Sequence, residues 1–218
     1  MNVRLKGNEE KISIIRLKFT LSVIVKVYII IFVMYSILGV IDHFSNSIDF
    51  SIVKSISQGD KFNGTYFILW LGLKTLIIAP VVEEFIFRKP IKFSKSGSVI
   101  LLVVVLYSIL MIIIKPHLNF YFLGSYAILM LGFFYFFRKK KNMNYIPLIF
   151  TSLVFGVFHI NNIEPVEPHQ WYLYIYNVFP IIILGIGLGL IRLRLNILWS
   201  IVGHSFFNLI PFFFKYIL

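Results

Sequence analysis

The sequence predicts an all-α fold, a polytopic transmembrane helical bundle of about seven spans, and three observations support this prediction. Hydrophobic residues make up 59% of the 218 residues and charged residues only 14%, whereas a typical soluble domain is about 25% charged. Long apolar runs recur along the chain, and short basic clusters separate many of them. Because a backbone in lipid has to satisfy its hydrogen bonds internally, each apolar run is expected to be a helix.

Seven runs are apolar enough to be spans, and crossing about 30 Å of hydrocarbon takes about 20 helical residues. The third and fifth runs are the shortest of the seven. The aromatic residues that begin the sixth run, Trp171, Tyr172 and Tyr174, are typical of a membrane interface. In chain order the runs cover residues 17–41, 65–88, 98–114, 118–137, 146–162, 171–191 and 196–217.

Basic and non-basic connections alternate in step with these runs. The N-terminal segment, the segment that follows Arg88, the cluster at 138–141 and the pair Arg192 and Arg194 are basic, whereas the connection at 161–170 is acidic. By the positive-inside rule, this alternation predicts a multi-pass protein of the cell membrane with a cytoplasmic N-terminus. The rule also accounts for the net charge of +12, so membrane lipid, and no nucleic acid, is the expected partner.

Three polar constellations interrupt the apolar runs, and the first ends the second run with Glu83, Glu84 and Arg88. Ionisable groups inside a span cost at least about 2.5–3.5 kcal/mol on insertion scales, which makes them functional candidates. Glu84 and Arg88 share a helix face at the i, i+4 spacing and are expected to pair. Glu83 is then left to face a cavity as a general base. The alternative is that all three side chains are simply solvated at the cytoplasmic end.

The second and third constellations carry the imidazoles. His159 follows Phe155 by one helical turn in the fifth run, and His204 and Asn208 stand at i, i+4 in the seventh. Such groups often serve only as hydrogen-bonding glue between helices. A histidine and asparagine pair can also donate hydrogen bonds to an oxyanion in a dry cavity. Phe155 is expected to pack, and Gly156 to permit the close approach of another helix.

Together, the three constellations supply a carboxylate base, histidines that hold a proton and a hydrogen-bond donor pair. These groups can activate water against an amide without a covalent intermediate, so no cofactor is expected. Metal-assisted hydrolysis is the chemical alternative, with Glu83, His159 and His204 as zinc ligands and water in the fourth position. The chain has no cysteine, which excludes disulfides, a thiol nucleophile and cysteine-ligated metals.

These constellations resemble the CAAX protease and bacteriocin-processing family, also called the Abi family of membrane proteases. That family carries Glu-Glu-x-x-x-Arg, Phe-x-x-x-His and His-x-x-x-Asn or His-x-x-x-Asp on successive membrane helices, and the chain has all three in this order within residues 65–210. The resemblance implies an all-helical intramembrane glutamate-type endopeptidase that acts on a membrane-associated protein or peptide. The roles it implies are Glu83 as general base, His159 as its helper, His204 and Asn208 as oxyanion donors, and Glu84 with Arg88 as a supporting pair.

The chain departs from the family in one respect, since a helical hairpin at about 98–137 separates the first two motifs. We therefore divide the chain in two. Residues 1–64 form an N-terminal cytoplasmic segment, a first span and an outer loop, and residues 65–218 form a peptidase core that contains the hairpin. By these boundaries Glu83 lies toward the cytoplasmic end of its span and His159 toward the outer end, so they meet only if the boundaries are shifted or the helices are staggered.

Two other functions stay open. Members of the family are associated with self-protection against bacteriocins, so the chain can be a non-catalytic membrane immunity or binding protein. It can also be a small transporter that uses Glu83 and the histidines as a proton relay, although transporters often show repeated halves and the sequence shows none. For a protease, processing of a bacteriocin leader or signal peptide is expected by analogy.

Overall fold

The computed structural model describes residues 2–45, 65–92, 94–114, 118–137, 145–162 and 172–216, and nearly all of them are helical. The predicted all-α fold is confirmed. The basic cluster at 138–141, most of the acidic connection at 161–170 and the aromatic residue Trp171 fall outside these ranges.

Six long helices match six of the predicted runs to within a few residues at most ends, although α1 extends well beyond its run in the N-terminal direction. Four segments are long and apolar enough to cross a membrane, namely Ile12–Ile37, Ser96–Ile114, Tyr176–Arg194 and Ile197–Phe214, and shorter apolar segments lie at Phe120–Tyr135 and Tyr145–Phe158. These lengths fit a membrane protein. The helices are α1 (Asn2–Ser45), α5 (Lys95–Ile114), α6 (Leu118–Phe137), α7 (Tyr145–Phe158), α8 (Tyr172–Arg194) and α9 (Ile197–Tyr216).

The second predicted run is helical throughout, as predicted, but its helix is not regular. Pro80 and Pro90 have no N–H to donate to the preceding turn, so each removes a hydrogen bond from the helix and favours a local distortion. The chain instead widens into two π-helical turns, a distortion that is frequent at functional sites. The elements in order are α3 (Thr65–Leu73), the π-turn η1 (Lys74–Ile78), α4 (Ala79–Glu83), the π-turn η2 (Glu84–Arg88) and the 3-10 turn η3 (Lys89–Lys92).

Side chains from other helices satisfy two backbone carbonyls that the prolines leave without a donor. In η1 the Ala79 N–H donates to Lys74, so the Thr75 carbonyl instead accepts from Asn208 Nδ2 of α9 at 3.1 Å. In η2 the Ile86 carbonyl accepts from the Tyr126 hydroxyl of α6, also at 3.1 Å. Since unpaired carbonyls are expensive away from water, these contacts fix the broken segment to α9 and to the hairpin.

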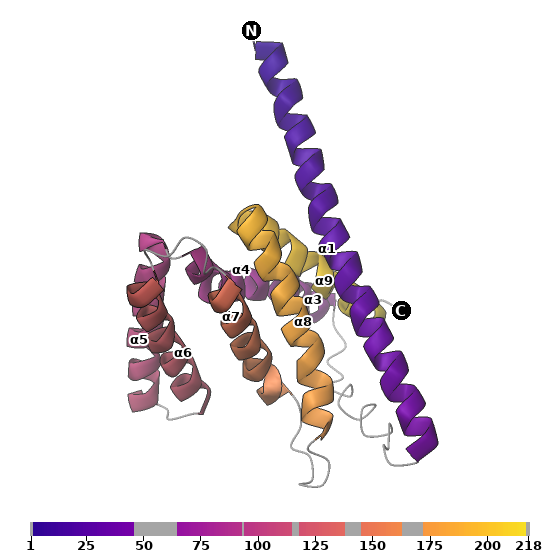
Figure 1. Ribbon diagram of the computed structural model, residues 1–218, viewed down its shortest axis with the longest axis vertical. Coiled ribbons are helices and arrows are strands. Elements are labelled where there is room, and N and C mark those ends of the chain that lie inside the picture. The colour runs from indigo at the N-terminus through magenta and orange to yellow at the C-terminus, as the bar shows by residue number, and fades with distance from the viewer. Residues whose placement is uncertain are drawn as a thin grey trace.

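The helices form a bundle in which α1 runs along one edge and the α5–α6 hairpin lies at the opposite edge (Figure 1). The N-terminal part of α1 projects beyond the other helices. Between these edges, α9 contacts α1, α8 and both π-turns, and α7 contacts α6, α8 and η2. Helices α7, α8 and α9 therefore surround the segment that carries the two adjacent glutamates.

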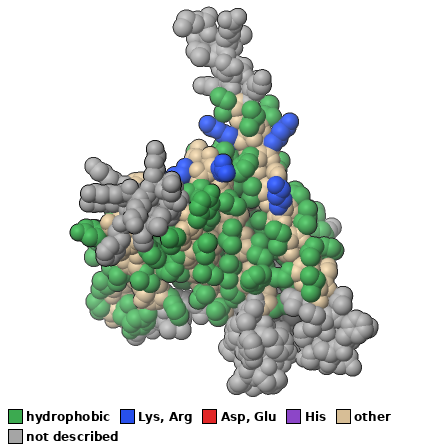
Figure 2. Space-filling model, in the orientation of Figure 1, with side chains coloured by type: hydrophobic (Ala, Val, Ile, Leu, Met, Phe, Trp, Pro, Cys, Tyr) green, Lys and Arg blue, Asp and Glu red, His purple; other side chains and the backbone are tan. Residues whose placement is uncertain are grey.

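Two apolar clusters hold the bundle together. One joins η2, the hairpin and α7 through residues such as Phe87, Tyr126 and Phe155, and the other joins α1 to α8 through residues such as Val27 and Leu188. Gly156 permits the close approach that the sequence predicts, because a Cβ atom there would lie 2.3 Å from the Ile182 side chain. Hydrophobic side chains also cover much of the outer surface, while Lys and Arg gather toward the end from which α1 projects (Figure 2).

Candidate active site

Glu83, His159 and His204 meet at one point although they come from three separate segments. His159 Nε2 lies 3.9 Å and His204 Nε2 lies 3.6 Å from the same oxygen, Glu83 Oε2. The side chains of Glu83 and His159 remain 24% and 18% exposed, so this side of the cluster is open to its surroundings. Glu83 ends the short helix α4, and His159 begins the 3-10 turn η4 (His159–Asn162) after α7, whose α-helical part ends at Phe158.

Hydrogen bonds at Nδ1 set the orientation of both imidazoles. His159 Nδ1 lies 2.7 Å from the Phe155 carbonyl, and His204 Nδ1 lies 3.1 Å from Glu84 Oε1. Because a carbonyl and a carboxylate only accept hydrogen bonds, each Nδ1 carries the proton. In the neutral imidazole, each Nε2 then presents a lone pair toward Glu83.

Glu84 is fully buried and binds three partners. Arg88 Nε lies 3.9 Å from its Oε1, as the i, i+4 spacing predicts, and His204 contacts the same oxygen. The Ser200 hydroxyl donates to Oε2. Glu84 thus orients His204 as well as pairing with Arg88, and sequence reasoning had given it only the second contact.

Ser200 is the site-forming residue that sequence reasoning missed. Its hydroxyl is buried between Glu84 and the Leu188 carbonyl of α8, from which it lies 3.0 Å. The available signal was helical periodicity, since Ser200 stands one turn before His204 on the face of α9 that also carries Asn208. A serine in an apolar helix is so often bonded to its own preceding turn that this spacing alone is a weak indication.

Phe155 packs, as predicted, and it packs against Arg88 and both histidines of the site. The Arg88 guanidinium lies over its ring, 4.6 Å from the centroid, and its ring meets those of His159 and His204 edge-on at 4.6 and 5.8 Å. Within the described residues, no Arg88 nitrogen has a hydrogen-bond partner. The cation is therefore balanced by the Glu84 carboxylate and the aromatic face.

Asn208 does not join the Glu83 cluster directly. Its Nδ2 donates to the Thr75 carbonyl, as described above, which anchors η1 to α9. An amide NH₂ group has two hydrogens, so this bond uses one of them.

An apolar cavity of about 310 Å³ opens beside Glu83. Lys74 and Glu83 are the charged residues of its lining, and Leu123 of the hairpin contributes to its wall. A second apolar pocket of about 510 Å³ lies between η2, α5 and α6 and shares Val82, Ile86 and Leu123 with the first. The hairpin therefore builds part of the surface from which an apolar chain would reach Glu83.

No group of three or more His, Asp or Glu side chains in the described residues is arranged to hold a metal ion.

A protein-family model described as type II CAAX prenyl endopeptidase Rce1-like matches residues 65–210, about two thirds of the chain. The matched residues run from α3 into α9 and include all three polar motifs, whereas α1 lies outside them. No curated protein and no solved structure matches the chain.

Proposed function

Since the chain belongs to the type II CAAX prenyl endopeptidase Rce1-like family, we propose that it hydrolyses a peptide bond of a membrane-associated protein or peptide with water activated at Glu83. Membership in this family makes the chain a CAAX-type protease of the membrane. One observation carries the proposed chemistry, namely that His159 Nε2 and His204 Nε2 both face Glu83 Oε2, at 3.9 and 3.6 Å.

Three hydrogen-bond acceptors converge at this point, which favours a hydrolytic role. With Nδ1 protonated on each neutral imidazole, two Nε2 lone pairs face a carboxylate oxygen. Such groups repel one another unless hydrogens lie between them. A water molecule supplies two hydrogens and, placed beside Glu83, is within reach of the imidazoles. The cluster is therefore suited to binding and polarising water.

In the proposed reaction, Glu83 takes a proton from water while the water oxygen attacks the carbonyl carbon of the scissile amide. The resulting oxyanion accepts a hydrogen bond from the second amide hydrogen of Asn208 and, once His204 Nε2 has taken a proton from solvent, a second hydrogen bond from His204. Glu83 then passes its proton to the leaving nitrogen, the C–N bond breaks, and a carboxylic acid and an amine leave. His159 helps to hold the attacking water.

Glu84, Arg88 and Ser200 act in this proposal through His204. Glu84 keeps the His204 Nδ1 proton in place, and Ser200 and Arg88 hold the two oxygens of Glu84. A carboxylate that fixes an imidazole in this way also stabilises its protonated form. These three side chains are positioning residues.

The substrate is proposed to approach along the apolar cavity that Glu83 lines. A membrane-associated chain can present apolar side chains to this wall, whereas a soluble polar peptide would leave its polar groups unsatisfied there. By analogy with the family, bacteriocin leader peptides and signal peptides are the substrates that we propose, and their cleavage is the form of processing or self-immunity.

A comparison of membrane peptides in cells that carry the wild-type chain or the Glu83→Gln variant tests this function. We expect substrates to accumulate and their cleaved products to disappear with Glu83→Gln, which keeps the side-chain shape and removes the base. Lys89→Gln, which changes a charge on η3 outside the cluster, is the matched control and should behave as wild type. If a folded Glu83→Gln variant keeps product formation, Glu83 is not the base. If it loses product formation and keeps full protection against bacteriocins, binding replaces hydrolysis as the protective function.

A further inference from the structure

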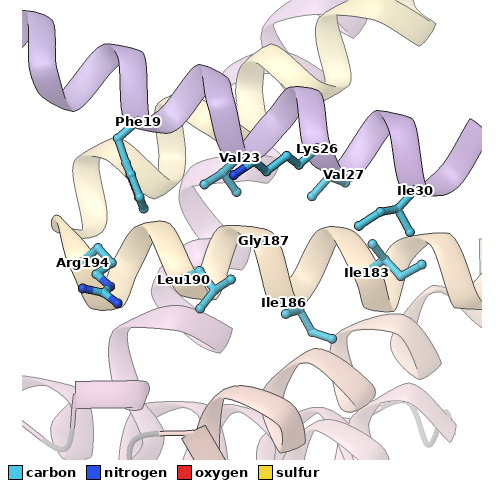
Figure 3. Close-up of a pocket in the computed structure, with 10 residues that line it drawn as sticks. All are labelled: Phe19, Val23, Lys26, Val27, Ile30, Ile183, Ile186, Gly187, Leu190 and Arg194. Atoms are coloured by element: carbon cyan, nitrogen blue, oxygen red, sulfur yellow. The ribbon is translucent and has the colours of Figure 1, made fainter.

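A groove between α1 and α8 lies apart from the candidate active site (Figure 3). It has a volume of about 570 Å³, its lining is mostly aliphatic, and its charged lining residues are Lys26 of α1 and Arg194 of α8. The two helices approach closely at Gly187, where a Cβ atom would lie 2.6 Å from the Val27 side chain. Since α1 lies outside the residues matched by the family, one wall of this groove is not part of the shared peptidase core.

The groove extends about as far as one leaflet of a bilayer. Phe19 and Arg194 lie at one end, and Ile30 and Ile183 lie at the other (Figure 3). At a rise of about 1.5 Å per residue, each wall is about 16 Å long, which is close to half of the roughly 30 Å of hydrocarbon in a bilayer. An apolar slot of this length beside a terminal cation matches a single acyl chain below its headgroup.

Lys26 is the feature that the fold alone does not explain. It lies near the middle of the apolar segment Ile12–Ile37, where a lysine is expensive and therefore a functional candidate. Its side chain is exposed, and no hydrogen bond or ion pair joins it to another of the described residues. In Figure 3 its amine extends along α1 toward the end of the groove that holds Phe19 and Arg194, as a snorkelling lysine does.

We propose that the groove binds an anionic phospholipid of the bilayer, with one acyl chain between α1 and α8 and the phosphate contacted by Lys26 and Arg194. Arg194 lies at one end of the apolar slot, and the amine of Lys26 extends from the middle of the α1 wall toward that end (Figure 3). These two cations complement an anion attached to a hydrocarbon chain, and basic pockets between transmembrane helices bind anionic headgroups. None of these residues contacts Glu83, His159 or His204, so this site is independent of the proposed hydrolysis.

Native mass spectrometry of the full chain in detergent tests the headgroup contact. The probes are phosphatidylglycerol and phosphatidylcholine with identical acyl chains, and we expect phosphatidylglycerol to bind more tightly. Lys26→Gln and Arg194→Gln should each weaken that binding about fivefold, since a basic residue near an anionic lipid surface contributes about 1 kcal/mol. Lys26→Arg should retain it. The matched control is Lys18→Gln, an exposed cation of α1 that does not line the groove, and it should bind as wild type.

Ile30→Trp tests the acyl-chain contact at the end of the groove opposite Arg194, where Ile30 and Ile183 lie. Ile30 is 50% exposed, so the larger ring fills the groove without overpacking the core, and the unfolding temperature should not fall. We expect both lipids to bind more weakly to this variant. Equal binding of the two lipids to wild type, or equal weakening by Lys18→Gln and Lys26→Gln, overturns the proposal. Unchanged phosphatidylglycerol binding by Ile30→Trp overturns it as well.

Discussion

Ser200 donates a hydrogen bond to Glu84 from one helical turn before His204, so one carboxylate binds two side chains of the same face of α9. The contact joins residues 116 positions apart in the sequence. It ties the π-turn that carries Glu84 to the helix that carries His204, and the geometry of the whole cluster depends on this connection.

Ser200→Ala should lower the rate of peptide hydrolysis more than it weakens substrate binding. Loss of a hydrogen bond to a buried charged group is typically worth about 1.5–3 kcal/mol, and a tenfold loss of kcat is expected if about half of that reaches the transition state. Steady-state kinetics would show kcat falling while KM stays nearly constant, and Ser200→Thr should recover most of the rate. A change in KM alone would contradict a positioning role.

Replacing one partner of the buried pair Glu84 and Arg88 should destabilise the protein more than replacing both. Both side chains are fully buried, and breaking such a pair leaves an uncompensated charge that typically costs about 3–5 kcal/mol. We expect Glu84→Leu to lower the unfolding temperature in detergent sharply, and Glu84→Leu with Arg88→Met to regain part of the loss. The pair is not coupled if the losses of unfolding temperature in Glu84→Leu and in Arg88→Met, each measured alone, add up to the loss in the double variant.

Tyr126→Phe should loosen the π-turn that ends with Arg88. The variant removes the donor to the Ile86 carbonyl. Pro90, one turn later, has no backbone N–H that could replace this donor, so we expect a loss of about 1 kcal/mol of stability. Thermal unfolding of the purified chain measures the change. Tyr121→Phe on the same helix is the control, because Tyr121 is 49% exposed, and a loss as large there would show that the Ile86 contact is not the cause.

Metal chelators should leave hydrolysis intact, because Glu83 and the two histidines are proposed to activate water by themselves. The measurement is product formation after dialysis of the purified chain against a strong zinc chelator. Activity that disappears on dialysis and returns on addition of Zn²⁺ would assign Glu83, His159 and His204 to a metal centre instead.

The proposed orientation places the N-terminal end of α1 in the cytoplasm. Because the chain has no cysteine, a single cysteine can be introduced at a chosen position. One variant carries it at Ile12, which begins the first apolar segment, and another carries it at Phe214, which ends the last one. In intact cells, a membrane-impermeant maleimide should label Phe214→Cys and not Ile12→Cys. The reverse pattern would invert the orientation.

Hydrophobicity and local periodicity determined the helical class, the approximate bounds of six long helices and the pairing of Glu84 with Arg88. These features depend on neighbours within a few residues, because a helix in lipid satisfies its own backbone and places i and i+4 on one face. The same local rules indicated that Gly156 would face a neighbouring helix. They also selected Glu83, His159 and His204 as candidates, since ionisable groups in apolar runs are rare.

Only the tertiary structure decided how these candidates meet. The prolines of the second run break it into π-turns whose freed carbonyls bind Asn208 and Tyr126, and this break lets Glu83 reach His159. The contact of Ser200 with Glu84 and the groove at Lys26 likewise depend on which helix faces adjoin. Helices that are apolar on nearly every side carry little information about their neighbours, so these long-range contacts depend on packing that no local pattern encodes.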